Sequence, residues 1–187
     1  MSQKELNHFL IAIIPPPDIE KDIYILKEHF KTNYNSRASL NSPPHITLHM
    51  PFDWRVDKSE EFIERLSQFA VAQHNFTIEL TNFGSFPPRV IFVEVGYSPD
   101  LIIFQKELHR FCKKEFNLYN AQYRDLPFHP HITLAFRDLK KPEYFKAWEE
   151  FEQRTYSASF EAKGFTLLRH DGKQWRPYHE FNFENNT

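Results

Sequence analysis

The chain has 187 residues, of which 41% are hydrophobic and 17% aromatic, so it can form one compact domain with a large apolar core. Its net charge of −2 argues against a broad electrostatic grip on duplex nucleic acid, and any such contact should be local, at an end or a short single strand. Only 4 glycines occur, and the sequence contains neither a glycine-rich triphosphate loop nor a dinucleotide-binding fingerprint.

Cysteine usage and the N-terminal apolar run bear on location. The single cysteine, Cys112, excludes an internal disulfide and fits a reducing compartment. The apolar run at residues 9–14 ends in three prolines, which makes it too short to span a membrane and unlike a signal peptide. We therefore expect a cytoplasmic monomer that makes no membrane contact and uses no cofactor.

The first half of the chain predicts alternating strands and helices. Continuous apolar runs and alternating patterns mark the strands, and apolar residues at helical spacing mark the helices. Asp18 is the expected N-cap of the first helix, and the aromatic segment 83–88 is expected to be a turn or loop. The elements lie at about residues 9–14, 18–31, 45–48, 59 onward and 76–81.

The same order of elements then starts again. Ser98 or Asp100 can cap the next helix, and Pro142 suits the first turn of a later one. Gly172 is expected to turn the chain toward Trp175. Strands are predicted at about residues 90–95, 131–134 and 158–169, and helices at about 101–111 and from 142 onward, the last with Phe145, Trp148 and Phe151 inward.

One tetrapeptide, His-Ile-Thr-Leu, occurs twice, at residues 45–48 and 131–134, each time after a proline. Residues i and i+2 of a strand share a face, so each histidine should lie beside its threonine while Ile and Leu point to the apolar side. A lone His-x-Thr means little in a chain with 10 histidines, but its recurrence with similar flanks is hard to obtain by chance. The alternative is two edge-strand histidines that face water.

The motif occupies the same place in both halves, which favours an internal duplication. The chain would then be one domain, residues 1–187, with two pseudo-symmetric lobes at about residues 6–88 and 89–180. A pseudo-twofold axis would bring the two motif strands together across a central cleft.

Paired His-x-Thr motifs in a duplicated chain resemble the two-histidine (2H) phosphoesterase superfamily, the LigT-like or 2′-5′ RNA ligase-like proteins. The resemblance covers essentially the whole chain and includes residues 9–16, 83–90 and 128–136. It implies a bilobal α+β fold, with two mostly antiparallel sheets around a central cleft and helices packed outside.

The resemblance also implies metal-independent cleavage of cyclic or 2′-5′ phosphodiesters. Carried over by motif position, the catalytic residues would be His45, Thr47, His131 and Thr133. The first motif departs from the family pattern because His49 follows Leu48. We expect this extra histidine on the polar face, where it could alter substrate contacts.

Two histidines can supply one base and one acid, because the ordinary imidazole pKa is about 6.5. For a cyclic phosphate, a neutral imidazole would take a proton from attacking water, and a protonated one would give its proton to the departing ribose oxygen. The threonine hydroxyls would hydrogen-bond the nonbridging oxygens, where negative charge grows. The sequence leaves open which histidine is the base, because the two motifs are equivalent.

Further residues near the motifs are candidate substrate contacts, each with a structural alternative. The phenylalanines could stack on a base but pack into the core by default, and the arginines could hold a phosphate but are by default solvated. The added histidines do not predict a metal site, because no carboxylate or cysteine lies at a familiar ligand spacing. These candidates are Phe86, Arg89, Tyr123, Arg124, Phe128, His49 and His129.

The leading functional prediction is a phosphoesterase acting on a 2′,3′-cyclic phosphate, or a related cyclic or 2′-5′ phosphodiester, of a nucleotide or an RNA end. One alternative is 2′-5′ RNA ligase-type activity from the same site, for which the low basicity makes a long RNA less suitable. Another is a noncatalytic module that binds nucleotides or RNA ends.

Overall fold

The computed structural model describes residues 5–119 and 127–184. None of the helices in these two ranges is both long and apolar enough to cross a membrane. In chain order the elements are β1 (Leu6–Ile13), α1 (Pro17–Tyr34), η1 (Ala38–Asn41), β2 (Ile46–Arg55), η2 (Val56–Lys58), α2 (Ser59–Val71), β3 (Phe76–Phe86), β4 (Val90–Val95), α3 (Pro99–Phe116), β5 (His131–Ala135), α4 (Lys141–Phe151), β6 (Ser157–Ala162), β7 (Gly164–His170) and β8 (Trp175–Asn182).

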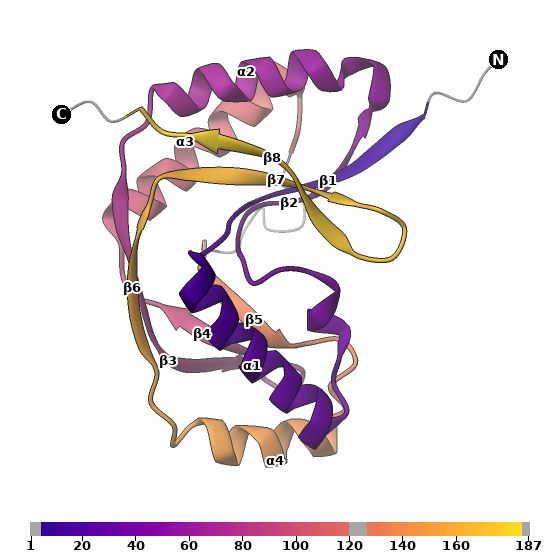
Figure 1. Cartoon of the computed structure of the whole chain (residues 1–187), viewed down its shortest axis with the longest axis vertical. Coiled ribbons are helices and arrows are strands. Elements are labelled where there is room, and N and C mark those ends of the chain that lie inside the picture. The colour runs from indigo at the N-terminus through magenta and orange to yellow at the C-terminus, as the bar shows by residue number, and fades with distance from the viewer. Residues whose placement is uncertain (1–4, 120–126, 185–187) are drawn as a thin grey trace.

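The strands of the described residues form one antiparallel sheet in the order β6-β3-β4-β5-β2-β1-β7-β8. The central strands β2 and β5 meet through the pair Ile46 and Ile132, so the sheet consists of two four-stranded halves. The predicted α+β class is confirmed, and the two expected sheets are the halves of a single curled sheet (Figure 1).

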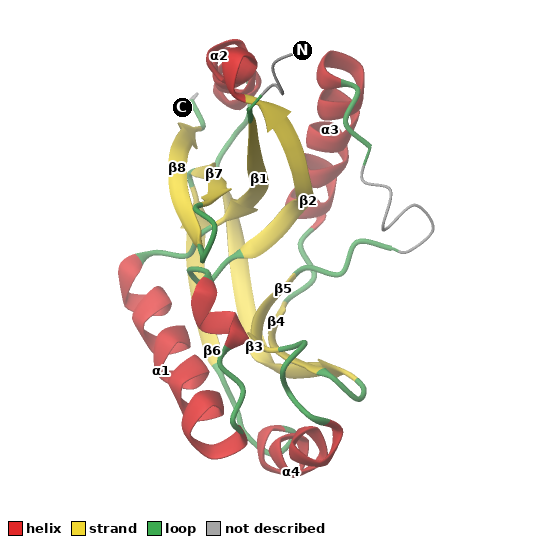
Figure 2. Cartoon of the chain, turned by 90° about the vertical axis from the view of Figure 1, so that its right-hand side faces the viewer, coloured by secondary structure: helices red, strands yellow, loops and turns green. Residues whose placement is uncertain are grey.

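Each half of the sheet takes strands from both sequence repeats. The third strand of the first repeat, β3, pairs with β4, whereas β7 returns to pair with β1. The helices are exchanged in the same way: α1 of the first repeat packs against β5 of the second, and α3 of the second repeat packs against β2 of the first. In Figure 2, α1 and α4 lie at one end of the molecule and α2 and α3 at the other. Each motif strand is therefore backed by a helix of the other repeat.

The helices α1 and α3 carry the signature of the repeat. Both have 18 residues, both begin at a proline, and both end at an asparagine in the left-handed conformation, Asn35 with φ 49° and Asn117 with φ 54°. Asparagine tolerates this conformation because its short side chain can hydrogen-bond locally. Position 27 of α1 and position 109 of α3 are thus equivalent, each ten residues after the opening proline.

One large apolar cluster joins the four helices to one face of the sheet. The Ile and Leu of both motifs belong to it, with exposed fractions of 0–1%. Burying one such side chain stabilises a fold by roughly 1.5–3 kcal/mol. A one-residue slip of either strand would expose these side chains, so the cluster also determines which face the histidines and threonines occupy.

Several predictions of local structure need correction. The N-cap of α1 is Pro16, which offers no side-chain cap, and Asp18 lies inside the first turn. The expected loop at 83–88 is in part strand, because β3 continues to Phe86. Phe145 is 54% exposed, and Tyr144 takes its place in the core. The predicted strand 158–169 is two strands, β6 and β7, which lie at opposite sides of the sheet, and β8 was not predicted.

Candidate functional site

The two motifs lie side by side on β2 and β5. With Ile46 opposite Ile132 in an antiparallel pair, the register sets Thr47 opposite His131 and places His45 beside Thr133. All four side chains share one face of the sheet, here called the motif face, opposite the large apolar cluster. The predicted catalytic residues are therefore brought together, and each is partly exposed.

Both imidazoles are oriented by the same hydrogen bond. Nδ1 of His45 lies 2.7 Å from the carbonyl oxygen of Pro43, and Nδ1 of His131 lies 2.8 Å from that of His129. A carbonyl oxygen can only accept, so Nδ1 carries the proton and donates in both rings. The neutral forms then leave Nε2 unprotonated, as a general base requires.

Burial makes both imidazoles harder to protonate. It lowers the pKa of His45 to about 4, opposed by the hydrogen bond to Pro43 and reinforced by the positive charges of Lys27 and His131. Burial also lowers the pKa of His131. The hydrogen bond to the His129 carbonyl opposes this, the charge of the His129 ring lowers the pKa further, and the Glu94 carboxylate raises it. The effect of the His131 charge on the pKa of His45 agrees with their adjacent strand positions.

The surroundings of His131 include a carboxylate that sequence reasoning missed. Glu94 of β4 is the register partner of His131, and its Oε1 lies 2.8 Å from Nε2 of His129. The signal was present, because Glu94 is the one charged residue in an otherwise apolar strand.

Aromatic rings lie around the second motif histidine. Phe86 is 39% exposed, and its ring centroid is 5.3 Å from that of His131, nearly perpendicular to it. Phe92 is buried beneath them, 4.6 Å from Phe86 and 4.7 Å from His131. The His129 ring completes the group at 5.2 Å from Phe86. Phe86 and His129, both predicted substrate contacts, thus adjoin the second motif.

A lysine on α1 lies behind the first motif, and it too was missed. The Lys27 side chain is buried, and its Nζ donates to the carbonyl oxygens of Ser39, at 2.9 Å, and Ser42, at 3.0 Å. Burial lowers the pKa of this ammonium to about 7, opposed by the carboxylate of Glu20. The sequence signal is a lysine within the apolar stripe of a helix, four residues after Ile23.

A polar brace, formed by residues 36–39 and Asp138, connects the segment before β2 to the end of β5. The Asp138 carboxylate accepts from Ser36 Oγ at 2.7 Å and from the backbone N–H groups of residues 37 and 38, each at 2.8 Å. Ser39 Oγ donates to the carbonyl oxygen of Leu134, the last residue of the second motif, at 2.6 Å. The position of the His45 segment is thereby coupled to that of the second motif strand.

The first motif has a corresponding contact on its own Leu carbonyl. His109 of α3 lies with Nε2 2.8 Å from the carbonyl oxygen of Leu48, and the Gln105 amide donates to the same oxygen at 3.5 Å. A serine hydroxyl and an imidazole thus make equivalent contacts in the two halves.

The prediction that His49 lies on the polar face is wrong. The register of β1 and β2 shifts between Thr47 and His49, a β-bulge, so that His49 pairs with the core residue Ile11. Its side chain is 2% exposed, and its ring meets those of Phe52 and His109. Burial lowers the pKa of His49 to about 4, opposed by the Met50 carbonyl and reinforced by His109.

The remaining predicted contacts lie elsewhere or outside the described residues. Arg89 is exposed in the turn between β3 and β4. Phe128 is partly buried and packs against the large apolar cluster, which is the structural alternative for a phenylalanine. Tyr123 and Arg124 fall in the range 120–126, which the structure does not describe.

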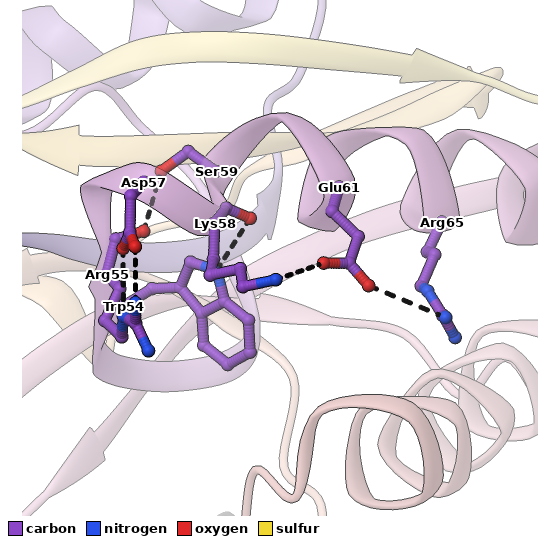
Figure 3. Close-up of polar contacts among 7 residues, drawn as sticks. All are labelled: Trp54, Arg55, Asp57, Lys58, Ser59, Glu61 and Arg65. Atoms are coloured by element: carbon purple, nitrogen blue, oxygen red, sulfur yellow. Dashed lines mark hydrogen bonds and ion pairs between the residues drawn. The ribbon is translucent and has the colours of Figure 1, made fainter.

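A separate hollow of about 500 Å³ lies at the far end of β2, beside α2 and the end of α3. The arginines of its lining are paired with carboxylates: Arg55 with Asp57 and Arg65 with Glu61 (Figure 3), and Arg65 also with Glu115. These pairs neutralise the cations that a phosphate would need. In the described part of the chain, no group of three or more His, Cys, Asp or Glu side chains is arranged to hold a metal ion.

Comparison with known proteins agrees with this fold and identifies the family. The model of the family described as "2'-5' RNA ligase superfamily" matches residues 15–174. The chain therefore belongs to the 2′-5′ RNA ligase superfamily, a group of two-histidine phosphoesterases.

Curated relatives come from Bacillus and are named as phosphoesterases. "Putative phosphoesterase BcerKBAB4_1135" of Bacillus mycoides is 29% identical over 136 residues, which cover 72% of each chain. "Putative phosphoesterase BCAH820_1309" of Bacillus cereus is also 29% identical, over 127 residues and 67% of each chain.

Solved structures share the fold at low sequence identity. TT0787 of Thermus thermophilus aligns with a TM-score of 0.68 and 16% identity, over 96% of this chain and 100% of its own. LigT of E. coli complexed with 3'-AMP aligns with a TM-score of 0.68 and 19% identity, over 96% and 99% of the two chains. These likenesses concern the fold alone.

Proposed function

We propose that this protein is a metal-independent cyclic phosphodiesterase that hydrolyses a 2′,3′-cyclic phosphate, or a related cyclic or 2′-5′ phosphodiester, of a nucleotide or an RNA end. The observation that carries the proposal is the register of β2 and β5, which sets each motif threonine beside the histidine of the other motif. Such an arrangement offers two imidazoles and two hydroxyls to a single phosphate.

The proposed reaction needs one proton acceptor and one proton donor. A neutral imidazole takes a proton from water as the water oxygen attacks phosphorus. The second imidazole, protonated, delivers its proton to the ribose oxygen as the bond from that oxygen to phosphorus breaks. Thr47 and Thr133 donate hydrogen bonds to the nonbridging oxygens. Each proton transfer is typically worth roughly 10²–10⁴ in rate.

The surroundings of the motifs support this substrate class. The partly exposed Phe86 ring beside His131 offers a surface on which a nucleobase can stack. The low net charge favours a mononucleotide or an RNA end over a long strand. The fold relative LigT of E. coli has been crystallised with 3'-AMP and with phosphate, which supports a nucleotide ligand for this chain as well. We also keep the prediction of one two-lobed cytoplasmic domain that acts as a monomer.

The test is hydrolysis of 2′,3′-cyclic AMP, CMP, GMP and UMP and of a short RNA with a 2′,3′-cyclic end, followed by phosphorus NMR and chromatography. We expect activity that survives EDTA, and a loss of about 10²-fold or more in kcat for His45→Ala and for His131→Ala. His74→Ala, an exposed histidine of the α2–β3 connection, is the matched control and should keep full activity.

The alternatives give different outcomes in the same experiment. A noncatalytic binding module would bind the nucleotides without turnover, in the wild type as in both alanine variants. A 2′-5′ RNA ligase would join RNA ends and show little net hydrolysis. Loss of activity in EDTA, restored by a divalent metal, would contradict the proposed acid–base scheme.

A further inference from the structure

The two motif histidines have different electrostatic surroundings, although the two motifs have the same sequence. Among the described residues, the charged groups that act on His45 are Lys27 of α1 and His131 of β5. Those that act on His131 are the neighbouring ring of His129 and the carboxylate of Glu94 of β4. One histidine therefore has a buried cation behind it, and the other has a carboxylate beside it.

The cation is held in place by the backbone that leads into the first motif. Lys27 Nζ donates to the Ser42 carbonyl, and the next carbonyl along the chain, that of Pro43, accepts from His45 Nδ1. Lys27 Nζ donates a second hydrogen bond to the carbonyl oxygen of Ser39, a residue of η1. Because Lys27 is only 1% exposed, water screens its charge little. On its own helix, the Glu20 carboxylate acts on this ammonium, and the Tyr24 ring centroid lies 5.6 Å from Nζ.

The carboxylate is held in place on the motif face itself. Glu94 is opposite His131 in the β4–β5 register and forms an ion pair with His129, whose carbonyl oxygen orients His131. Gly84 of β3 leaves the room for this arrangement, because a Cβ there would lie 2.3 Å from Glu94 Oε2. The lack of a side chain at position 84 therefore leaves space for the Glu94 carboxylate beside His129.

We propose that Lys27 and Glu94 are positioning residues that divide the roles of the pair, so that His45 is the general base and His131 is the general acid in hydrolysis. Lys27 disfavours a proton on His45, and Glu94 favours one on His131. In the forward step, His45 Nε2 takes the proton of water, and His131 Nε2 gives its proton to the ribose oxygen that leaves phosphorus. The proposal rests on the proposed function, because both roles refer to that reaction.

The first test reads the two histidines directly and needs no substrate. Proton–nitrogen NMR of the intact protein follows each imidazole against pH, with assignments from His45→Gln and His131→Gln. We expect His131 to titrate above His45. Lys27→Met should raise the pKa of His45 by about 0.5–1, because it removes a like charge, and should leave that of His131 nearly in place. Glu94→Gln should lower the pKa of His131 by a similar amount.

The second test is the pH profile of kcat/KM. His45 must be unprotonated to act, so Lys27→Met should move the acid limb to higher pH. His131 must be protonated, so Glu94→Gln should move the alkaline limb to lower pH. Each shift of about 0.5–1 unit corresponds to about a 3- to 10-fold change in rate on that limb. A merely structural role would lower the rate at every pH and move neither limb.

Matched variants separate charge from packing. Lys21→Met and Glu79→Gln remove exposed charges from α1 and β3 and should change neither titration. Lys27→Arg keeps the positive charge and should keep the pKa of His45 low. If Lys27→Met does not fold, Glu94→Gln still decides the His131 half of the proposal.

Two results would overturn the inference. One is that His45 titrates at or above His131 in the wild type. The other is that Glu94→Gln leaves the titration of His131 and the alkaline limb unchanged. A wild type inactive on every cyclic phosphate would instead overturn the proposed function, while the NMR order of the two histidines would still stand or fall on its own.

Discussion

Replacing Asp138 with alanine should loosen the brace that couples the His45 segment to β5. The carboxylate accepts three hydrogen bonds, from Ser36 Oγ and from the N–H groups of residues 37 and 38, at 2.7–2.8 Å. A hydrogen bond to a charged group is worth about 1.5–3 kcal/mol, and less where water can replace the acceptor, as at this partly exposed site. At about 1 kcal/mol for each bond, Asp138→Ala should lower the free energy of unfolding by about 2–4 kcal/mol.

Asp138→Asn distinguishes hydrogen-bond geometry from charge. The amide oxygen can accept from both backbone N–H groups while the amide nitrogen donates to Ser36 Oγ, so three contacts remain, and the losses are the charge and the acceptor of the Ser36 hydroxyl proton. We expect a loss of about 1 kcal/mol for this variant. Glu28→Ala, which removes an exposed ion pair with Lys31, is the control and should change stability by no more than about 0.5 kcal/mol.

Urea unfolding followed by tryptophan fluorescence, with calorimetry in parallel, measures these differences. In a domain of this size, 1 kcal/mol moves the melting temperature by about 2–4 °C, so Asp138→Ala should melt about 4–16 °C below the wild type. The reasoning fails if Asp138→Ala matches the Glu28 control. It also fails if the alanine and asparagine variants lose equal stability, because the count of retained hydrogen bonds would then be irrelevant.

Three further predictions concern other parts of the molecule. In the folded protein, His49 has a pKa of about 4 and stays neutral above that pH, whereas in the unfolded chain it gains a proton below about pH 6.5. The free energy of unfolding should therefore decrease by up to about 3 kcal/mol as the pH is lowered from about 6.5 to 4. His49→Leu should remove one proton from this pH dependence, as measured by urea unfolding at each pH. Gly164→Ala should cost about 2 kcal/mol or more, measured the same way, because its Cβ would lie 2.1 Å from the Phe181 carbonyl oxygen and force β7 from β8. Phe86→Ala should raise KM for a cyclic nucleotide by about 5-fold or more with little change in kcat; a fall in kcat alone would contradict a stacking role.

Local patterns in the sequence were sufficient for much of the fold. The apolar run of β1 and the apolar spacing of α1 each depend on neighbours within a few residues, and the structure confirms both elements. The i, i+2 rule placed each motif histidine and threonine on one face, because the Ile and Leu between them must be buried. These inferences needed no knowledge of which strands pair.

The failures concern pairing between distant strands. Residues 158–169 read as one strand, but the chain crosses from β6 beside β3 to β7 beside β1 at Lys163, and no local pattern marks that crossing. The alternation of faces along a strand predicts His49 on the same face as His45, but a bulge in the pairing of β2 with β1 interrupts this alternation. Glu94 became a candidate only when the register placed it opposite His131.

The exchange of helices between the halves explains how identical motifs come to differ. Position 27 of α1 and position 109 of α3 are equivalent in the duplication, yet the first is a buried lysine beside the His45 segment and the second is a histidine on the Leu48 carbonyl. Both contacts serve the first motif, whereas the second motif receives its counterpart from Ser39 in η1. The charge at position 27 therefore acts on His45, the histidine of the segment that it contacts. The exchange of helices therefore gives two strands with identical motifs different neighbours within one sheet.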